Sequence, residues 1–95
     1  MARFVRPGKD EVRKRRLELR DKAGSGRLVL PQGIRDMRLA VGQTQEEFAH
    51  MLRLTRRQIA EMETGRANPT YETLNRIGKL FGFEIAFVPR VNADE

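Results

Sequence analysis

The chain has 95 residues, of which 19 are Lys or Arg and 13 are Asp or Glu, so its formal net charge is +6. A chain of this length forms one small domain and buries only about 60 to 65% of its unfolded surface, which excludes a two-domain enzyme. The absence of cysteine from the sequence excludes disulfides, thiolate nucleophiles and Cys-ligated zinc. A small fold without such cross-links depends on helix packing or on a partner chain.

Candidate catalytic residues are scarce in this sequence. His50 is the only histidine and Ser25 the only serine. A nucleophile, a base and an orienting acid therefore cannot be assembled into a triad, and no group of residues has the spacing of metal ligands. We expect a protein that is not an enzyme and that uses no cofactor or metal.

Membrane insertion and secretion are not expected either. No stretch approaches the roughly 18 apolar residues that a membrane span needs. The N-terminal part is rich in arginine, where a signal peptide would carry an apolar segment. We therefore expect a cytoplasmic protein without a membrane partner.

The excess positive charge lies in residues 1–27, which carry ten basic and four acidic side chains, whereas residues 28–95 carry nine of each. The first part can become helical from Asp10 to Ala23, but its few apolar residues form no stripe. We expect a semi-independent arm on a flexible Gly-Ser-Gly joint. Its basic run is either a solvated helix face or a contact surface for polyanions, of which we favour DNA over a membrane surface. The run consists of Arg13, Lys14, Arg15 and Arg16.

Four helices are expected between residues 32 and 82. The short apolar run 28–30 before them fits either a strand or a lead into a helix. The first helix begins at Gln32 and stops at Gly42, and the next two begin with capping boxes at Thr44 and Thr55. The fourth follows Pro69 and ends before Gly82. The side chains expected to face the core are Ile34, Met37, Val41 or Leu39, Phe48, Ala49, Leu52, Ile59, Met62, Tyr71, Leu74, Ile77, Leu80 and Phe81.

The hydrophobic period changes to two after Gly82. Phe83, Ile85 and Phe87 alternate with other residues up to Pro89, which predicts a β-strand over residues 83–88. A lone strand leaves its backbone donors and acceptors unpaired, so it requires a partner. The same strand of a second copy is the simplest partner, and residues 28–30 of either copy are the alternative. Residues 91–95 are expected to be a frayed tail.

The segment from Arg38 to Phe81 resembles the Xre/Cro-type helix-turn-helix family of DNA-binding domains, found in phage repressors, bacterial regulators and antitoxins. The resemblance implies a mainly α fold, a lambda-repressor-like domain of four helices. To this the residue pattern adds the C-terminal strand, which would pair between subunits, and the basic arm. The strand-like ending is similar to that of HipB-type antitoxins. We divide the chain into an arm (1–27), the helix-turn-helix domain (28–82), a dimerising strand (83–90) and a tail (91–95). The matching residues are 44–49, Leu54, Thr55, Ile59, 63–65, Pro69, Leu74 and Ile77.

The residues expected to read bases lie on the third of the four helices. An arginine fork matches guanine O6 and N7, and a glutamate can accept from a cytosine amino group. The alternative for Arg57 and Glu61 is a surface ion pair four residues apart. The predicted base-reading residues are Arg56, Arg57, Gln58 and Glu61.

Phosphate contacts are expected from the helix ends, by resemblance to the family. Capping by itself also explains Thr44 and Thr55. The predicted phosphate-contacting residues are Thr44, Gln45, Thr55, Thr64 and Arg66.

Two further positions follow from the same resemblance. Arg38 and Glu63 are similar to an ion pair of the family that is structural. Arg53 stands in the turn, where family members usually have a glycine because the chain takes left-handed dihedrals, and arginine there costs about 1 kcal/mol.

The sequence thus predicts a homodimeric, sequence-specific transcriptional repressor that binds double-stranded DNA at a pseudo-palindromic operator and occludes polymerase. The alternative is an antitoxin that binds a cognate toxin and regulates its own operon. The two functions are compatible with each other.

Overall fold

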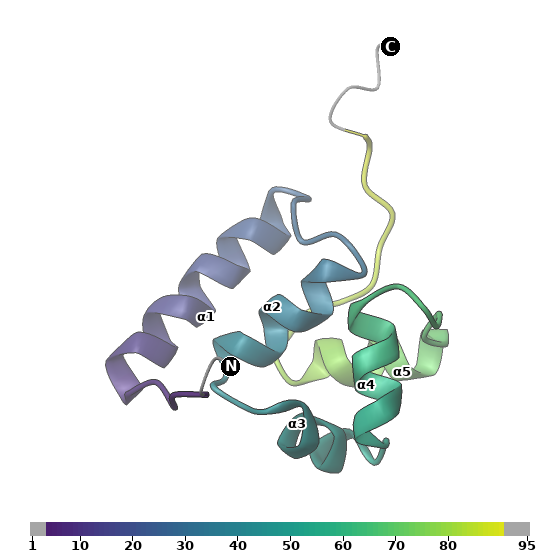
Figure 1. The fold of residues 1–95 in the computed structure, drawn as a ribbon. Coiled ribbons are helices and arrows are strands. Elements are labelled where there is room, and N and C mark those ends of the chain that lie inside the picture. The colour runs from purple at the N-terminus through teal and green to yellow at the C-terminus, as the bar shows by residue number, and fades with distance from the viewer. Residues whose placement is uncertain (1–3, 91–95) are drawn as a thin grey trace.

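The computed structural model describes residues 4–90, and this part of the chain contains five helices and no strand (Figure 1). The predicted mainly α fold with four helices after residue 32 is confirmed, and a further helix precedes them. The helices are α1 (Lys9–Gly24), α2 (Gln32–Ala40), α3 (Gln45–Leu52), α4 (Arg56–Glu63) and α5 (Tyr71–Lys79).

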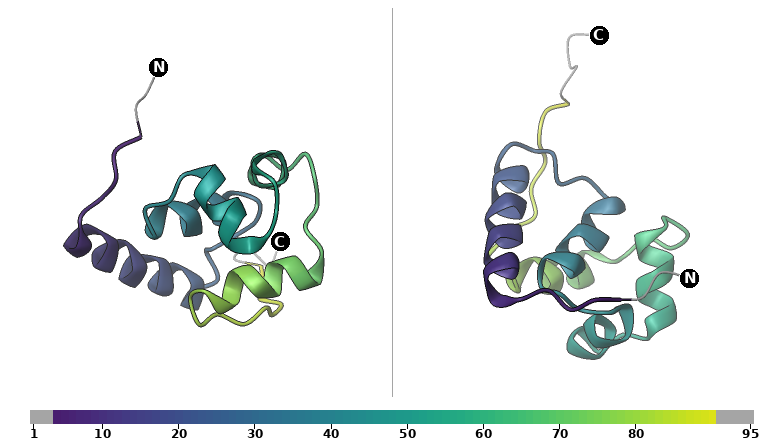
Figure 2. Two further views of the ribbon diagram at one scale, coloured as in Figure 1. Left: turned by 90° about the horizontal axis from the view of Figure 1, so that it is seen from below. Right: turned by 60° about the vertical axis from the view of Figure 1, so that its left-hand side comes forward.

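The hydrophobic core lies between α2, α3, α4 and α5. The helix α2 packs against both α1 and α4, and α3 packs against α4 and α5. Figures 1 and 2 show α1 on one side of α2 and α4 on the other, so α2 separates the N-terminal helix from α4. Each of the four core helices supplies one fully buried side chain: Ile34, Phe48, Ile59 and Ile77.

The ends of the core helices follow from local sequence signals. Both predicted capping boxes are present, at Thr44 before α3 and at Thr55 before α4. Gly42 ends the turn after α2 with a φ of +68°, which a residue with a side chain rarely adopts. The expected core position at Tyr71 is wrong, because this residue opens α5 at the surface and is 70% exposed.

The helix expected in the basic segment is present as α1, but its expected independence is wrong. Leu19 is 5% exposed and belongs to the hydrophobic core. Lys22 forms an ion pair with Asp36 on α2 at 3.0 Å, and Arg15 donates to the backbone oxygen of Leu39 at 3.0 Å. One buried leucine and long basic side chains therefore dock this helix without the apolar stripe that the sequence lacks.

The strand predicted over residues 83–88 is not formed within this chain. Phe83 still donates to Gly78 O at 2.9 Å, and residues 84–90 then continue as an irregular segment beside the loop that follows α1 (Figure 1). Residues 28–30, the alternative strand, are also irregular. Neither segment has a neighbouring strand with which to form backbone hydrogen bonds, because no strand exists among residues 4–90. Pairing with a second copy stays a prediction, and the predicted tail lies outside the described residues.

Candidate functional site

The turn between α3 and α4 fixes how α4 is presented. Arg53 has φ 59° and ψ 41°, the left-handed conformation that the resemblance to the family implied for this position. The backbone nitrogen of Leu54 donates to Ala49 O at 2.8 Å, and Arg76 of α5 donates to Leu52 O at 2.9 Å. The end of α3 is therefore held both by its own turn and by α5.

Two capping boxes order the N-termini of α3 and α4. The hydroxyl of Thr44 accepts from the backbone nitrogen of Glu47 at 3.1 Å, and the Glu47 carboxylate accepts from the backbone nitrogen of Thr44 at 3.0 Å. Thr55 and Gln58 form the same arrangement at 3.1 and 2.8 Å. The side-chain oxygen of Gln58 is therefore engaged within α4, while its amide nitrogen can still donate to another group.

The outward face of α4 carries the residues predicted to read bases. Arg56 and Arg57 are exposed at the first two positions of the helix. The Nε of Arg57 lies 3.1 Å from the Oε2 of Glu61, so the surface pair four residues apart is present in the free chain. This pair leaves both terminal nitrogens of the Arg57 guanidinium available and orients them, which favours a positioning role for Glu61.

The last predicted contacts lie at the C-terminal end of α4. The hydroxyl of Thr64 donates to Ala60 O at 3.0 Å, so it already completes the end of its own helix. Arg66 is exposed, and no hydrogen bond or ion pair joins its side chain to the residues that the structure describes. Arg66 is therefore the freer of the two to contact a phosphate.

A buried ion pair connects α2 to the end of α4, as the resemblance implied. The Nε and Nη2 of Arg38 donate to the two carboxylate oxygens of Glu63 at 2.7 and 3.1 Å, and the two side chains are only 8% and 3% exposed. Gln45 at the start of α3 donates to the same carboxylate at 3.1 Å. Only one N–H of its amide is used, so the other can donate outward. The pair thus locks three helices together.

Sequence reasoning missed Arg6, which lies next to the start of α3. It donates to Gly42 O at 3.0 Å and to the Glu47 carboxylate at 2.8 Å. The bond from Arg6 is the main reason that the pKa of Glu47 is below its usual range, helped by the backbone bond from Thr44. Arg6 and Glu47 are 41 positions apart, so no local spacing signal connects them.

The basic run of α1 does not form one surface. Arg15 bonds to Glu11 and to α2, whereas Arg16 reaches the other way, to Leu80 O at 3.4 Å, with its guanidinium 5.3 Å from the centre of the Phe81 ring. Arg13 and Lys14 have no ion pair among the described residues. Contact of this run with DNA stays a prediction.

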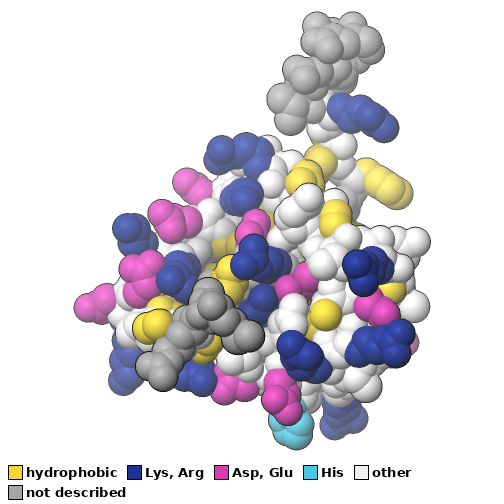
Figure 3. Space-filling view, viewed as in Figure 1, with side chains coloured by type: hydrophobic (Ala, Val, Ile, Leu, Met, Phe, Trp, Pro, Cys, Tyr) yellow, Lys and Arg dark blue, Asp and Glu magenta, His cyan; other side chains and the backbone are white. Residues whose placement is uncertain are grey.

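The molecular surface carries charges of both signs and a group of apolar side chains. In Figure 3, Lys and Arg side chains are interspersed with Asp and Glu, while hydrophobic side chains gather around the C-terminal segment.

Between residues 4 and 90 there is no group of three or more residues suited to holding a metal ion. Within the same range, each helix is too short or too polar to span a bilayer.

A family model described as helix-turn-helix matches residues 34–88, which is more than half of the chain. The chain belongs to the Xre/lambda-repressor-like helix-turn-helix family. Neither the curated proteins nor the solved structures contain a match to it. Membership identifies the protein as a DNA-binding transcription regulator. The helix α1 lies outside the matched residues.

Proposed function

We propose that this helix-turn-helix protein is a sequence-specific repressor, with α4 as the helix that reads the major groove of double-stranded DNA. The observation that carries this proposal is the exposure of Arg56 and Arg57 at the N-terminal end of a rigidly held helix. Helices of this type present their N-terminal residues to base edges. An arginine fork recognises guanine through O6 and N7, and Glu61 holds Arg57 in position for it.

Phosphate contacts would flank α4 on both sides. The start of α3 carries Thr44 and Gln45, whose outward amide N–H can donate to a phosphate oxygen next to the positive end of the helix. The start of α4 carries Thr55, and its end carries Thr64 and Arg66. Such contacts set the register on the duplex without reading its sequence.

The C-terminal segment supports a homodimer. Phe87 is fully exposed, and Val88, Ile85, Val29 and Leu30 are each at least 40% exposed. The last four of these side chains border an apolar cleft of about 460 Å³ between residues 26–30 and 83–88. Exposed apolar groups gathered in this way mark protein contact surfaces. We propose that the 83–88 segments of two copies pair with each other, and that the dimer represses by covering a pseudo-palindromic operator against polymerase.

Selection of duplexes from a random pool by the full-length protein, followed by footprinting, tests this function. We expect two inverted half-sites whose centres are about one helical turn, or a multiple of it, apart. Failure to enrich any sequence would contradict specific recognition. Enrichment of a single half-site without an inverted repeat would contradict the homodimer and leave recognition by α4 intact.

An antitoxin that binds a toxin and regulates its own operon is the second candidate function. The observation that favours it is the position of α1, which carries much of the positive charge and lies across α2 from α4. A surface there would stay accessible while α4 occupies DNA. Co-expression with a neighbouring toxin-like gene product, followed by co-purification, tests this candidate.

A further inference from the structure

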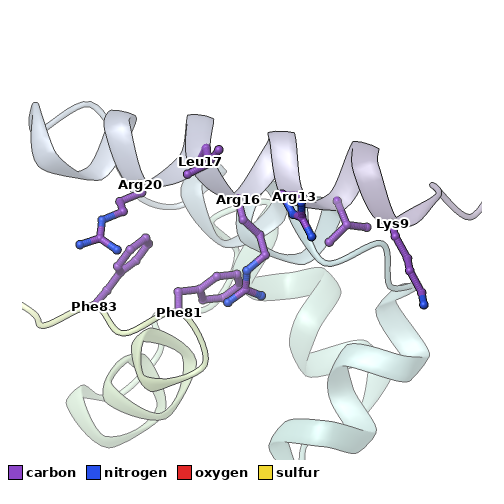
Figure 4. A pocket seen from close by; sticks show the side chains of 8 residues that line it. Lys9, Arg13, Arg16, Leu17, Arg20, Phe81 and Phe83 are labelled. Atoms are coloured by element: carbon purple, nitrogen blue, oxygen red, sulfur yellow. The ribbon is translucent and has the colours of Figure 1, made fainter.

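A basic and aromatic cleft of about 400 Å³ lies between α1 and the chain just after α5 (Figure 4). Lys9, Arg13, Arg16 and Arg20 line its α1 side, spaced by four, three and four residues, which places them on one helical face. No acidic side chain lines this cleft. Its positive charge is therefore not compensated from within.

The opposite wall of the cleft is apolar and fixed in place. The rings of Phe81 and Phe83 stack with their centres 5.6 Å apart. A Cβ on Gly78 would lie 2.9 Å from Phe83 O, so the turn that places Phe83 depends on the glycine. On the α1 side, Leu17 is 63% exposed at the edge of the cleft. An apolar side chain of a partner could thus bury itself between Leu17 and Phe83.

Most of the cations in the cleft are available to a partner. Arg16 is held by Leu80 O and by the Phe81 ring. Within residues 4–90, no hydrogen bond or ion pair holds Lys9, Arg13 or Arg20, and Figure 4 shows Arg13 and Arg20 extending from α1 on the side of the two rings. Three unpaired cations next to a half-buried apolar wall match a segment that carries both carboxylates and apolar side chains.

The alternative occupant is nucleic acid, and the geometry favours it less. The cleft lies on α1, which α2 separates from the proposed reading helix α4 (Figures 1 and 2). A duplex backbone offers nothing apolar to cover Leu17. Stacking of unpaired bases is also hindered, because Phe81 already contacts both Phe83 and the Arg16 guanidinium.

We propose that this cleft binds an acidic, partly apolar segment of a partner protein. The carboxylates of the segment pair with Lys9, Arg13 and Arg20, and one of its apolar side chains packs on Leu17 and Phe83. This inference does not depend on recognition of DNA by α4. Because of the position of α1, the partner and DNA can be bound at the same time.

A synthetic peptide serves as the probe, with about 12 residues in which glutamates and leucines follow helical spacing, and with a fluorescein label. Anisotropy titration of the full-length protein should give a dissociation constant tighter than about 100 µM. The double substitution Arg13→Glu and Arg20→Glu should weaken this binding at least about tenfold, since it replaces attraction by repulsion. The matched control Lys14→Glu with Arg27→Glu changes the net charge equally but lies outside the cleft. It should weaken binding less than about twofold.

A second variant keeps the test independent of charge. Leu17→Ser alters an exposed side chain, so the fold should persist, and it should weaken the peptide about threefold or more through the lost apolar contact. Equal weakening by the two double variants, or no effect of Leu17→Ser, would overturn the proposal and leave general charge attraction as the explanation.

The same variants are titrated on the selected operator and on a scrambled duplex at several salt concentrations. The proposal requires the Arg13/Arg20 variant to match the Lys14/Arg27 control on DNA. If instead the Arg13/Arg20 variant flattens the slope of log K against log salt by about 0.9 per substituted side chain relative to the control, the cleft is a phosphate-binding surface, and the proposed protein partner is wrong.

Discussion

The body of the molecule, formed by the core helices α2 to α5, and its N-terminal helix α1 differ in how their charged side chains are buried and paired. In the body, Arg38 and Glu63 are almost fully buried and share two hydrogen bonds. On α1, Lys22 meets Asp36 with 44% and 38% of the two side chains exposed, and Arg13 and Arg20 have no such partner among residues 4–90. Buried charges must be paired to be tolerated, whereas exposed ones stay hydrated and accessible. The body therefore uses its buried ion pair for architecture, and the appended helix keeps part of its charge exposed to solvent.

The largest difference between the two regions is expected when one partner is removed from the buried ion pair and from the exposed one. Glu63→Ala leaves the Arg38 guanidinium buried without its carboxylate and should lower the free energy of unfolding by about 3 to 5 kcal/mol. Asp36→Ala removes an exposed partner and should lower it by less than about 1 kcal/mol. Urea unfolding followed by circular dichroism measures both. Similar losses for the two variants would show that burial does not distinguish the pairs.

The C-terminal segment, residues 83–88, lies at the opposite end of the chain from α1 and is proposed to pair between two copies. Ile85→Pro should convert the proposed dimer to a monomer, because it removes a backbone donor from the proposed pairing between copies. Among residues 4–90, no backbone hydrogen bond from Ile85 is formed, so the helical circular dichroism spectrum of the monomer should be unchanged. Sedimentation velocity reports the mass. A variant that stays dimeric would place the interface elsewhere, for instance on α5.

Within the body, the turn between α3 and α4 contains a left-handed backbone conformation at Arg53. Arg53→Gly relieves a left-handed conformation at an exposed side chain and should raise the free energy of unfolding by about 0.5 to 1 kcal/mol. Arg53→Ala keeps the strain without the charge and serves as the control. Thermal unfolding of the two variants gives the difference, and a loss of stability in the glycine variant would contradict the strain.

The contact between Arg6 and Glu47 is expected to give the smallest effect, since both side chains are largely exposed. Arg6→Ala should move the pKa of Glu47 up toward its usual range, because the hydrogen bond from Arg6 is the main cause of its lowering. In the natural chain this pair stabilises the fold at neutral pH, and the contribution disappears as the pH falls through the lowered pKa. Carboxyl NMR titration of both proteins measures the shift. An unchanged pKa in the variant would show that capping alone lowers it.

Local spacing in the sequence was enough to predict the central domain. The two capping boxes and most of the core positions depend on residues within one or two helical turns of each other. The left-handed turn at Arg53 was implied by the resemblance to the family. The docking of α1 could not be predicted in this way. It depends on Leu19, on Lys22 with Asp36 and on Arg15 with Leu39, which are contacts between separate helices.

The predicted strand shows a second limit. Alternation over residues 83–88 describes side chains, but a strand also needs a neighbour to accept and donate hydrogen bonds. Among residues 4–90 no such neighbour exists, so the segment stays irregular in the single chain. The proposed contacts of Arg56 and Arg57 with DNA cannot be seen in a single chain either, since their proposed partner is another molecule.

The most direct test of the account is the specificity ratio of the double variant Arg56→Ala and Arg57→Ala. Its affinity for the selected operator and for a scrambled duplex is measured at one salt concentration and compared with that of Arg66→Ala. We expect the double variant to lose about 1 to 3 kcal/mol per arginine on the operator and less on the scrambled duplex, so that its preference largely disappears. Arg66→Ala should weaken binding to both duplexes evenly. An unchanged ratio of the two affinities in the double variant would contradict the assignment of α4 as the helix that reads bases.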